Sequence, residues 1–479
     1  MRMSSCVKNL ALDSAFQGAV RQVFQFNQNQ LRYAYIYTFG CQMNVHESEI
    51  FTGILMECGY LQAGSPEQAD VILINTCCIR EHAEQKILGL LGTLRELKEK
   101  KPELIIGLCG CMTQQRHFSE KIRSRFPYVD IVLGTNAADK LPGAVLKALT
   151  EQGKAKKTVF LEENDNSILE NAPTARARSV TSWLTIMYGC NNFCTYCIVP
   201  YVRGRERSRD SNAILSEAQQ LVKEGTKEIT LLGQNVNSYG KELNESFAHL
   251  LRQMNQIDGL ERIRFMTSHP KDISDEVIDA FAQCGKVCEH LHLPLQSGSS
   301  RILQAMNRHY DAEKYWKIVE KLRTAQPKIE ISTDIIVGFP GETEEDFQQT
   351  LEFVERMRYS FAFMFAFSPR KGTKAADMEG QVPNEVKKER LQRLIELQNQ
   401  ISTQISRDYI GKTVEILSEG FCAQDDEECS AKDPLLQVGR TRTNKKVYFS
   451  CEEDTQGKLL QMDITNSATV TLNGKVVNR

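Results

Sequence analysis

A chain of 479 residues is too long for one ordinary hydrophobic core, so roughly two to four domains are expected. Its 41% hydrophobic and 25% charged residues exclude a disordered or fibrous chain, and no apolar run is long enough for a membrane-spanning helix. The net charge of −2 does not exclude nucleic acid, because arginines and lysines gathered on one face bind phosphates even in a neutral protein. The N-terminal residues lack the unbroken apolar stretch of a secretory signal, so a cytoplasmic protein without membrane contact is expected.

The first half of the chain reads as an α/β domain. Residues 1–31 precede the first clear strand and form an N-terminal extension. From residue 32 to residue 149, apolar runs alternate with helical patterns, beginning with RYAYIYTFG, and this rhythm predicts a flavodoxin-like domain with a parallel sheet. Residues 150–180 are polar and lose the alternation, so they are predicted to be a linker with one short strand at TVFLE.

The second half predicts two further domains. Between residues 181 and 408 the alternation returns, and six βα units indicate a partial (βα)6 barrel with its chemistry at the C-terminal ends of the strands. The expected strands are WLTIMYG, EITLLGQ, RIRFMTS, HLHLPL, ISTDIIVG and FMFAF. Residues 409–479 carry short strand-like runs that predict a small β-barrel.

Three cysteines stand close together at the end of the first strand of the predicted barrel. Cys190, Cys194 and Cys197 form the pattern C-x-x-x-C-x-x-C. Three thiolates in one turn can hold three irons of a [4Fe–4S] cluster and leave the fourth iron open. A structural zinc site is the alternative, but it requires four protein ligands and no fourth cysteine or histidine lies nearby in the sequence.

Three more cysteines follow strands of the N-terminal domain. Cys41 follows YAYIYTFG, Cys77 follows DVILINT, and Cys111 follows IIGLCG. The C-terminal ends of parallel strands lie along one edge of a sheet, so these side chains are expected to converge and hold a second cluster. Spacing alone does not decide between Cys109 and Cys111.

A band of arginines follows the cysteine pattern within seven residues: Arg203, Arg205, Arg207 and Arg209. One interpretation is a solvated face, partly neutralised by Glu206 and Asp210. The other is a set of guanidinium groups that bind phosphates or a carboxylate, which their fork of donors suits.

The segments TFGCQMN, NTCCIRE and GCMTQQR, together with the C-x-x-x-C-x-x-C pattern, resemble the methylthiotransferase family of the radical S-adenosylmethionine (SAM) superfamily. The resemblance extends from about residue 32 to the C-terminus. RFMTSHP, HLHLPLQSGSSRILQAMNRHY, TDIIVGFPGETEEDF and GRTRTNKKVYF look like the branch that acts on isopentenylated tRNA. The chain departs from that branch at His46, Cys78, Thr113 and Lys371, none of which is a proposed ligand.

The resemblance implies an enzyme with two [4Fe–4S] clusters, one held by Cys41, Cys77 and Cys111 and the other by Cys190, Cys194 and Cys197. These six cysteines are the predicted catalytic and metal-binding residues. One SAM molecule is cleaved to a 5′-deoxyadenosyl radical and another donates a methyl group. The implied reaction replaces the C2 hydrogen of N6-isopentenyladenosine-37 with a methylthio group. The implied partners are a tRNA anticodon stem-loop, an external electron donor and a sulfur donor, and the protein is expected to be a monomer.

The resemblance also implies binding residues. Contacts to SAM are expected from Gln234, Asn235, Gln296, Ser297, Asp334 and Arg203. The C-terminal module resembles the TRAM domain, a small RNA-binding β-barrel. Contacts to RNA are expected from Arg205, Arg207, Arg440, Arg442, Lys445 and Lys446, with the rings of Tyr448 and Phe449 available for stacking. A basic hairpin on an ordinary β-barrel has the same sequence pattern.

Two other functions compete with this interpretation. A methylthiotransferase of another branch acts on threonylcarbamoyl-adenosine in tRNA or on an aspartate of a ribosomal protein, and the residues CQMN argue against both. An RNA-binding protein whose cysteines hold only structural metal is the alternative from a different class, and it predicts zinc and no cleavage of SAM.

Overall fold

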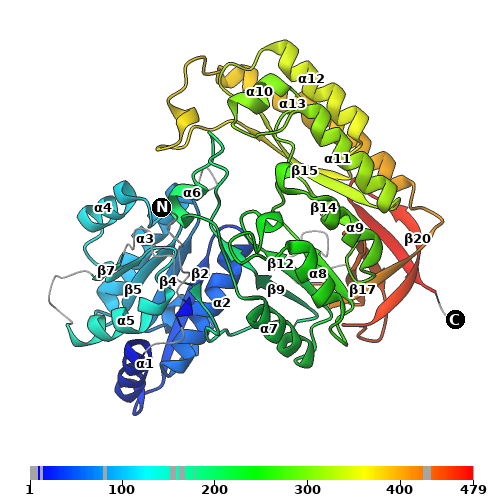
Figure 1. Ribbon diagram of the computed structural model, residues 1–479. Helices are drawn as coiled ribbons and strands as arrows, with labels where there is room; N and C mark the ends of the chain where they lie inside the picture. Colours follow the sequence, from blue (N-terminus) through cyan, green and yellow to red (C-terminus); the bar gives the residue numbers. More distant parts are fainter. Residues whose placement is uncertain are drawn as a thin grey trace. The chain divides into compact units, whose positions relative to one another are not determined.

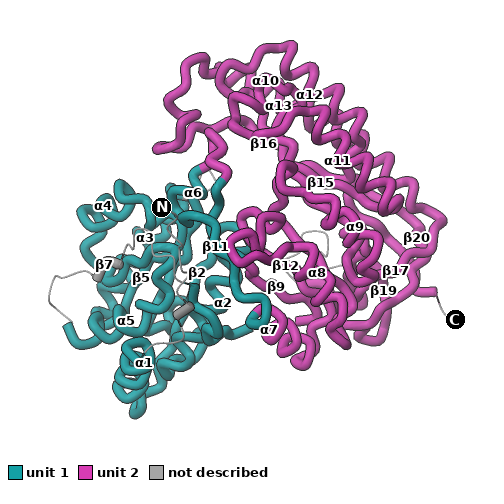
Figure 2. The backbone as a smooth tube through the Cα atoms, in the orientation of Figure 1, with its two compact units in different colours: residues 1–177, 187–191, 198–213 teal, residues 178–186, 192–197, 214–479 magenta. Residues whose placement is uncertain are grey.

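The computed structural model describes residues 9–10, 14–78, 83–151, 158–160, 168–176, 179–423 and 433–477 (Figure 1). The chain divides into two compact units (Figure 2). Unit 1 comprises residues 1–177, 187–191 and 198–213, and unit 2 comprises residues 178–186, 192–197 and 214–479. None of the described helices is both long enough and apolar enough to cross a membrane.

Unit 1 is built on a six-stranded parallel sheet with the strand order β3-β2-β4-β5-β6-β7. The strands are β2 (Arg32–Thr38), β3 (Tyr60–Gln62), β4 (Val71–Thr76), β5 (Ile105–Gly110), β6 (Ile131–Leu133) and β7 (Thr158–Phe160). In chain order the first five strands follow the 2-1-3-4-5 arrangement of flavodoxin-like folds, which confirms the predicted fold class. The strand predicted at TVFLE is the sixth strand of this sheet.

Helices cover both faces of this sheet because its central strands are apolar on both sides. The buried residues of β4 alternate between two cores: Val71 and Leu73 face one, and Ile72 and Ile74 face the other. The first core is closed by α1 (Ser14–Asn27), α2 (Gln42–Glu57) and α5 (Leu141–Thr150), and the second by α3 (Ala83–Lys100) and α4 (Arg116–Arg125). Part of the predicted N-terminal extension is therefore the helix α1, which packs on the sheet.

Smaller elements complete unit 1. They are β1 (Asn9–Leu10), which pairs with β8 (Ile168–Leu169), the 3-10 turns η1 (Pro66–Gln68) and η2 (Ala138–Lys140), the hairpin of β10 (Met187–Tyr188) and β11 (Arg207–Ser208), and α6 (Val199–Arg203).

Unit 2 begins with six parallel strands that neighbour one another in chain order. They are β9 (Thr181–Thr185), β12 (Glu228–Leu232), β13 (Arg262–Phe265), β14 (His290–His292), β15 (Glu330–Val337) and β16 (Phe361–Ala366). They form two three-stranded sheets, β13-β12-β9 and β14-β15-β16, joined by a parallel bridge between Ile263 and Val287. This succession confirms the predicted partial barrel.

The helices of unit 2 follow the strands as the sequence rhythm predicts. They are α7 (Ser211–Lys223), α8 (Phe247–Asn255), α9 (Asp275–Gln283), α10 (Ser300–Ala305), α11 (Ala312–Ala325), α12 (Glu344–Met357) and α13 (Asn384–Arg407), with 3-10 turns η3 (Val236–Ser238), η4 (Pro270–Asp272) and η5 (Lys374–Ala376). Several begin at side-chain caps; at α12 the Thr343 hydroxyl and the Asp346 carboxylate form a capping box.

The C-terminal module of unit 2 is a closed five-stranded barrel in the order β17-β18-β19-β21-β20. Its strands are β17 (Thr413–Phe421), β18 (Leu436–Thr441), β19 (Lys446–Ser450), β20 (Leu459–Ser467) and β21 (Thr471–Val476). Buried Arg262 and Arg264 of β13 donate hydrogen bonds to carbonyl oxygens of the β18–β19 turn, which ties this barrel to the six-stranded core.

Candidate metal centres and cofactor-binding residues

The three cysteines of unit 1 lie where β2, β4 and β5 end. Cys41 is the N-cap of α2, Cys77 directly follows β4, and Cys111 directly follows β5. Gly40 has a φ of +124°, and a Cβ added to it would come within 2.9 Å of the Cys77 sulfur, so only glycine lets the chain before Cys41 lie against Cys77.

Cys111 lies among donors that favour its thiolate. The Cys78 thiol hydrogen-bonds to the Cys111 sulfur and lowers the pKa of Cys111. The Arg203 guanidinium also lowers this pKa, whereas burial raises it. The Arg203 Nε donates to the Cys111 Sγ over 3.1 Å. Cys78 therefore stays a thiol that supports its neighbour.

Cys109, the alternative that spacing alone leaves open, is buried in the core under the sheet. Its sulfur donates to the Ile74 carbonyl oxygen, and burial raises the pKa of its thiol. A protonated thiol inside an apolar core is a packing residue, so this placement agrees with the choice of Cys111 as a ligand.

Arg203 links Cys111 to Cys41 through Asn44. Its Nη1 pairs with the Glu47 carboxylate at 2.6 Å, and its Nη2 donates to the Asn44 Oδ1 at 3.1 Å. The same Asn44 oxygen lies 3.6 Å from the Cys41 sulfur. Arg203, predicted to bind SAM, thus lies at the unit 1 cysteines, and its assignment to SAM stays a prediction. Sequence reasoning missed Asn44 and Glu47 because their partner is more than 150 residues away.

The donor set of unit 1 fits a cluster better than a single ion. Among the described residues, no three His, Cys, Asp or Glu side chains surround one ion position. In a [4Fe–4S] cluster each thiolate binds a different iron, so its ligands stand farther apart than the ligands of one zinc ion. Three cysteines at one sheet edge, with hydrogen-bond donors to the Cys111 sulfur, suit such a cluster.

The other arginines of the predicted band are mostly buried in unit 1. The Arg207 Nη2 donates to the Asn136 Oδ1 at 3.1 Å, and Arg209 forms a buried ion pair with Glu170 at 2.7 Å. Arg205 is the exposed member of the four. This placement favours neither a solvated face nor a phosphate-binding band for Arg207 and Arg209, and the RNA-binding roles of Arg205 and Arg207 stay predictions.

The second cysteine pattern is divided between the units. Cys190 belongs to unit 1, where its N–H donates to the Gly204 carbonyl oxygen at 3.1 Å. Cys194 and Cys197 belong to unit 2. There the Thr195 N–H donates to the Met306 carbonyl oxygen at 3.1 Å, which holds the loop against the end of α10.

A buried arginine also contacts this second set. The Arg308 Nη1 lies 3.5 Å from the Cys194 sulfur, and its Nη2 donates to the Pro294 carbonyl oxygen at 2.9 Å. Arg308 stands in the segment AMNRHY, but nothing in that pattern marks it as a partner of a cysteine more than 100 residues earlier.

The residues predicted to contact SAM lie in the loops after β12 and β14 and, for Asp334, within β15. The Asn235 Nδ2 donates to the Asp272 carboxylate at 2.8 Å, and Gln234 precedes it in the same loop. Gln296 has a φ of +74° and pairs through its backbone with Asp334 and Ile336, and Ser297 is buried beside Thr350. Their contacts to SAM stay predictions.

Buried polar atoms without a hydrogen-bond partner gather in the same loops. They are both amide atoms of Asn237 after β12, the Ser268 Oγ and the His269 Nε2 after β13, and the Gln296 Oε1 after β14. Each such atom costs about 1–3 kcal/mol unless a ligand satisfies it. The loops at the C-terminal ends of three consecutive strands therefore fit a bound polar cofactor such as SAM.

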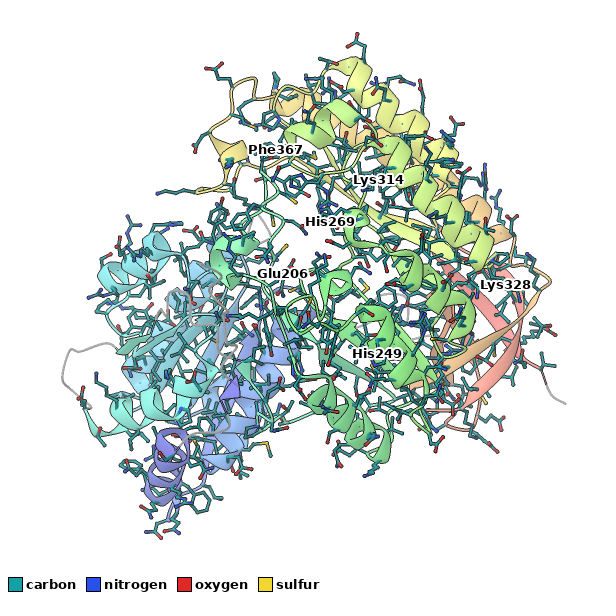
Figure 3. The ribbon with its side chains drawn as sticks, viewed as in Figure 1. Glu206, His249, His269, Lys314, Lys328 and Phe367 are labelled. Atoms are coloured by element: carbon teal, nitrogen blue, oxygen red, sulfur yellow. The ribbon has the colours of Figure 1, made fainter. Side chains whose placement is uncertain are left out.

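His269, labelled in Figure 3, illustrates the hydrogen bonds that these atoms can form with a ligand. Burial, assisted by the Arg308 and Lys271 cations, lowers the pKa of His269, so the ring is neutral. Its Nδ1 accepts the Lys271 N–H at 3.3 Å, which leaves the proton on Nε2. The Nε2–H is a buried donor ready for an acceptor atom of a ligand.

Three of the four cations predicted to bind RNA at the β18–β19 turn form ion pairs within unit 2. Arg442 pairs with Glu289 at 2.7 Å, Lys445 is buried beside Glu330, and Arg440 pairs with Glu419. The Lys446 ammonium lies 3.3 Å from the Tyr448 hydroxyl. The RNA-binding roles of these four cations stay predictions. The expectation of stacking by Tyr448 and Phe449 was wrong, because both rings are buried in the barrel.

Comparisons with known proteins agree with this anatomy. Residues 184–354 match the family described as the radical SAM superfamily, and residues 33–134 match the uncharacterized protein family UPF0004. The tRNA-2-methylthio-N(6)-dimethylallyladenosine synthase of Caldicellulosiruptor saccharolyticus is 50% identical over 95% of this chain and 94% of its own. The synthase of the same name from Clostridium botulinum is 51% identical over 92% of this chain and 96% of its own.

Solved structures share the fold at low sequence identity. The radical SAM methyltransferase TsrM from Kitasatospora setae superposes with a TM-score of 0.53 at 11% identity, covering 72% of this chain and 74% of that one. The cobalamin-dependent radical SAM enzyme OxsB superposes with a TM-score of 0.51 at 13% identity, covering 78% of this chain and 57% of that one.

Proposed function

Because this chain belongs to the family of radical SAM tRNA-2-methylthio-N(6)-dimethylallyladenosine synthases, we propose that it replaces the C2 hydrogen of N6-dimethylallyladenosine-37 in tRNA with a methylthio group. The observation that carries this function is the identity of about half of all residues across nearly the full length of two synthases. No observation favours the threonylcarbamoyl-adenosine or ribosomal-protein substrates.

Two triplets of cysteines are proposed to hold two [4Fe–4S] clusters. The auxiliary cluster belongs to Cys41, Cys77 and Cys111, which the sheet of unit 1 brings to one edge. The radical SAM cluster belongs to Cys190, Cys194 and Cys197, by their spacing in the sequence. With SAM bound, these groups supply the adenosyl radical and carry the sulfur to be transferred.

The protein's own residues position these groups and keep water away from them. Arg203 and Cys78 donate to the Cys111 sulfur and hold it as a thiolate at a fixed place. The Arg308 Nη1 lies 3.5 Å from the Cys194 sulfur and holds that side chain in place. The buried atoms of Asn237, His269 and Gln296 supply donors and acceptors that orient a polar cofactor in a dry site.

The partners follow from the reaction. The tRNA substrate presents adenosine-37 in its anticodon loop, where unpaired bases can leave the stack. Cleavage of SAM requires an electron, and the product gains a sulfur atom, so an external reductant and a sulfur source are necessary. We propose that the chain acts as a monomer in the cytoplasm.

The experiment is anaerobic incubation of the reconstituted protein with isopentenylated tRNA, SAM, sulfide and a low-potential reductant, followed by mass spectrometry of the nucleosides. Appearance of 2-methylthio-N6-dimethylallyladenosine supports the proposal, with unmodified tRNA as the control substrate. If 5′-deoxyadenosine forms without that nucleoside, the radical chemistry stands and the substrate assignment fails. Zinc in place of iron, with no 5′-deoxyadenosine, contradicts the enzyme assignment altogether.

A further inference from the structure

Strand β16 exposes a row of three phenylalanines, called here the aromatic face: Phe361, Phe363 and Phe365. The strand lies at the edge of the sheet β14-β15-β16. Successive residues of a strand point to opposite faces, so these three rings share one face. Their exposed fractions are 37%, 45% and 50%, whereas Ala362 between them is buried. The side chains on this face are therefore presented to a ligand or to solvent.

A contiguous row of exposed rings is unlike an ordinary protein surface. Single exposed apolar side chains are common, but large apolar residues gathered on one strand indicate a binding site. The rings of Phe361 and Phe363 contact each other edge to face with centroids 4.8 Å apart. This contact gives the strand a preformed apolar surface on which a planar group can stack.

A carboxylate of the neighbouring strand lies beside the aromatic face. Asp334 of β15 is the direct register partner of Phe363. Its Oδ1 lies 3.4 Å from the His292 Nε2, and 29% of its side chain is exposed. The His292 ring meets Phe363 edge to face, and its Nδ1 is 3.0 Å from the Ser332 hydroxyl. The Asp334 carboxylate is thus fixed beside the central ring and can accept a proton donor from a stacked ligand.

The chain that leaves β16 carries positive charge. The segment PRKGTK, residues 369–374, contains Arg370, Lys371 and Lys374 and no acidic residue. Lys371 and Lys374 are exposed. An aromatic row followed directly by cations matches unpaired RNA, in which bases stack on rings and phosphates pair with basic side chains.

We propose that the aromatic face binds the target nucleotide of the RNA, an adenine with an apolar dimethylallyl group on N6. The purine stacks on the phenylalanine rings, and the dimethylallyl group covers the rest of the row. The N6–H donates to the Asp334 carboxylate, which this proposal assigns to the substrate in place of the SAM contact expected from the sequence. The basic segment at Lys371 and Lys374 holds the adjoining phosphates. This inference rests on the proposed function and assigns its substrate site.

The test compares two synthetic anticodon stem-loops that differ only in the dimethylallyl group. Their dissociation constants are measured by fluorescence anisotropy with the anaerobically reconstituted full-length protein, without reductant so that no turnover occurs. The variants are Phe363→Ala, Phe365→Ala and Asp334→Asn. Phe421→Ala is the matched control, because Phe421 is exposed to the same 45% but lies on β17 of the C-terminal barrel.

The wild-type protein is expected to prefer the dimethylallylated stem-loop. Loss of one stacking ring should weaken its binding by roughly 5- to 100-fold and bring the two dissociation constants together. Asp334→Asn should weaken binding of both stem-loops, because both carry an N6–H. Phe421→Ala should change neither constant. Iron content and a thermal melt establish that each variant is folded, and removal of an exposed ring leaves no core cavity.

The possible outcomes test the substrate site and the proposed function separately. If Phe363→Ala and Phe365→Ala bind both stem-loops as tightly as the control variant, the aromatic face is not the substrate site, even when the wild-type protein forms the methylthiolated product. If the wild-type protein neither prefers the dimethylallylated stem-loop nor modifies it, the proposed function itself fails.

Discussion

Replacement of Arg203 by methionine should destabilise unit 1 selectively. Arg203 and Glu47 form an ion pair whose side chains are only 6% and 12% exposed, and Arg203 also donates to Asn44 and Cys111. Removing one partner of a buried pair leaves the other charge uncompensated and costs about 3–5 kcal/mol. For a unit of this size each kcal/mol lowers Tm by about 2–4 °C, so the transition should fall by roughly 6–20 °C.

The two tryptophans make the assay selective. Trp183 and Trp316 both belong to unit 2, so tryptophan fluorescence follows that unit, whereas far-UV circular dichroism follows both. In metal-free protein, Arg203→Met should move an early circular dichroism transition and leave the fluorescence transition nearly unchanged. Adding Glu47→Gln should recover part of the loss, because no unpaired carboxylate then remains.

A surface ion pair supplies the control for this prediction. Arg95 and Glu99 pair at 2.9 Å, but both side chains are more than 60% exposed, and such pairs contribute about 0–1 kcal/mol. Arg95→Met should therefore have little effect. If Arg203→Met has an equally small effect, or lowers both transitions together, the account of a buried ion pair supporting unit 1 is refuted.

The remaining predictions concern the cysteines, the C-terminal barrel and pH. Cys111→Ala should lose one cluster's iron while Cys109→Ala keeps it, measured by iron analysis after reconstitution; equal loss in both would contradict the assigned ligand. Arg442→Ala should speed hydrogen exchange in the β18–β19 turn by breaking its bonds to the core, whereas Lys446→Ala should lower the salt dependence of RNA binding by about one unit of slope. Burial and the Arg264 cation lower the pKa of His290, so unfolding takes up a proton below the ordinary histidine pKa of about 6.5. Stability of unit 2 should fall as pH drops below that value, and His290→Gln should flatten the dependence in urea titrations followed by fluorescence.

The order of the elements could be read from the sequence because it depends on local patterns. Runs such as VILINT and ISTDIIVG are apolar enough to be parallel strands in any context, and the helical patterns between them leave a parallel sheet as the arrangement that buries both faces. The positions of Cys41, Cys77 and Cys111 after their strands also predicted that they lie along one edge of the sheet.

Tertiary structure decided what neighbours each side chain has. Arg203 and Cys111 are 92 residues apart, and no local pattern pairs them, so the sequence could not show that this arginine, predicted to bind SAM, contacts the Cys111 sulfur. Cys109 and Cys111 differ by two residues, yet one ends in an apolar core and the other among hydrogen-bond donors because the strand ends between them.

The row of phenylalanines on β16 is another case in which tertiary structure decides the surroundings of side chains. The sequence FAFMFAF predicts a strand whose alternate residues share a face. Because phenylalanine is usually buried, the sequence alone predicts that these rings are buried. Only the packed structure shows that α13 packs against β16 and that Ala362 is buried while the three rings remain exposed. Period-two alternation determines which residues lie together, and the packing of distant segments determines which of the two faces stays exposed.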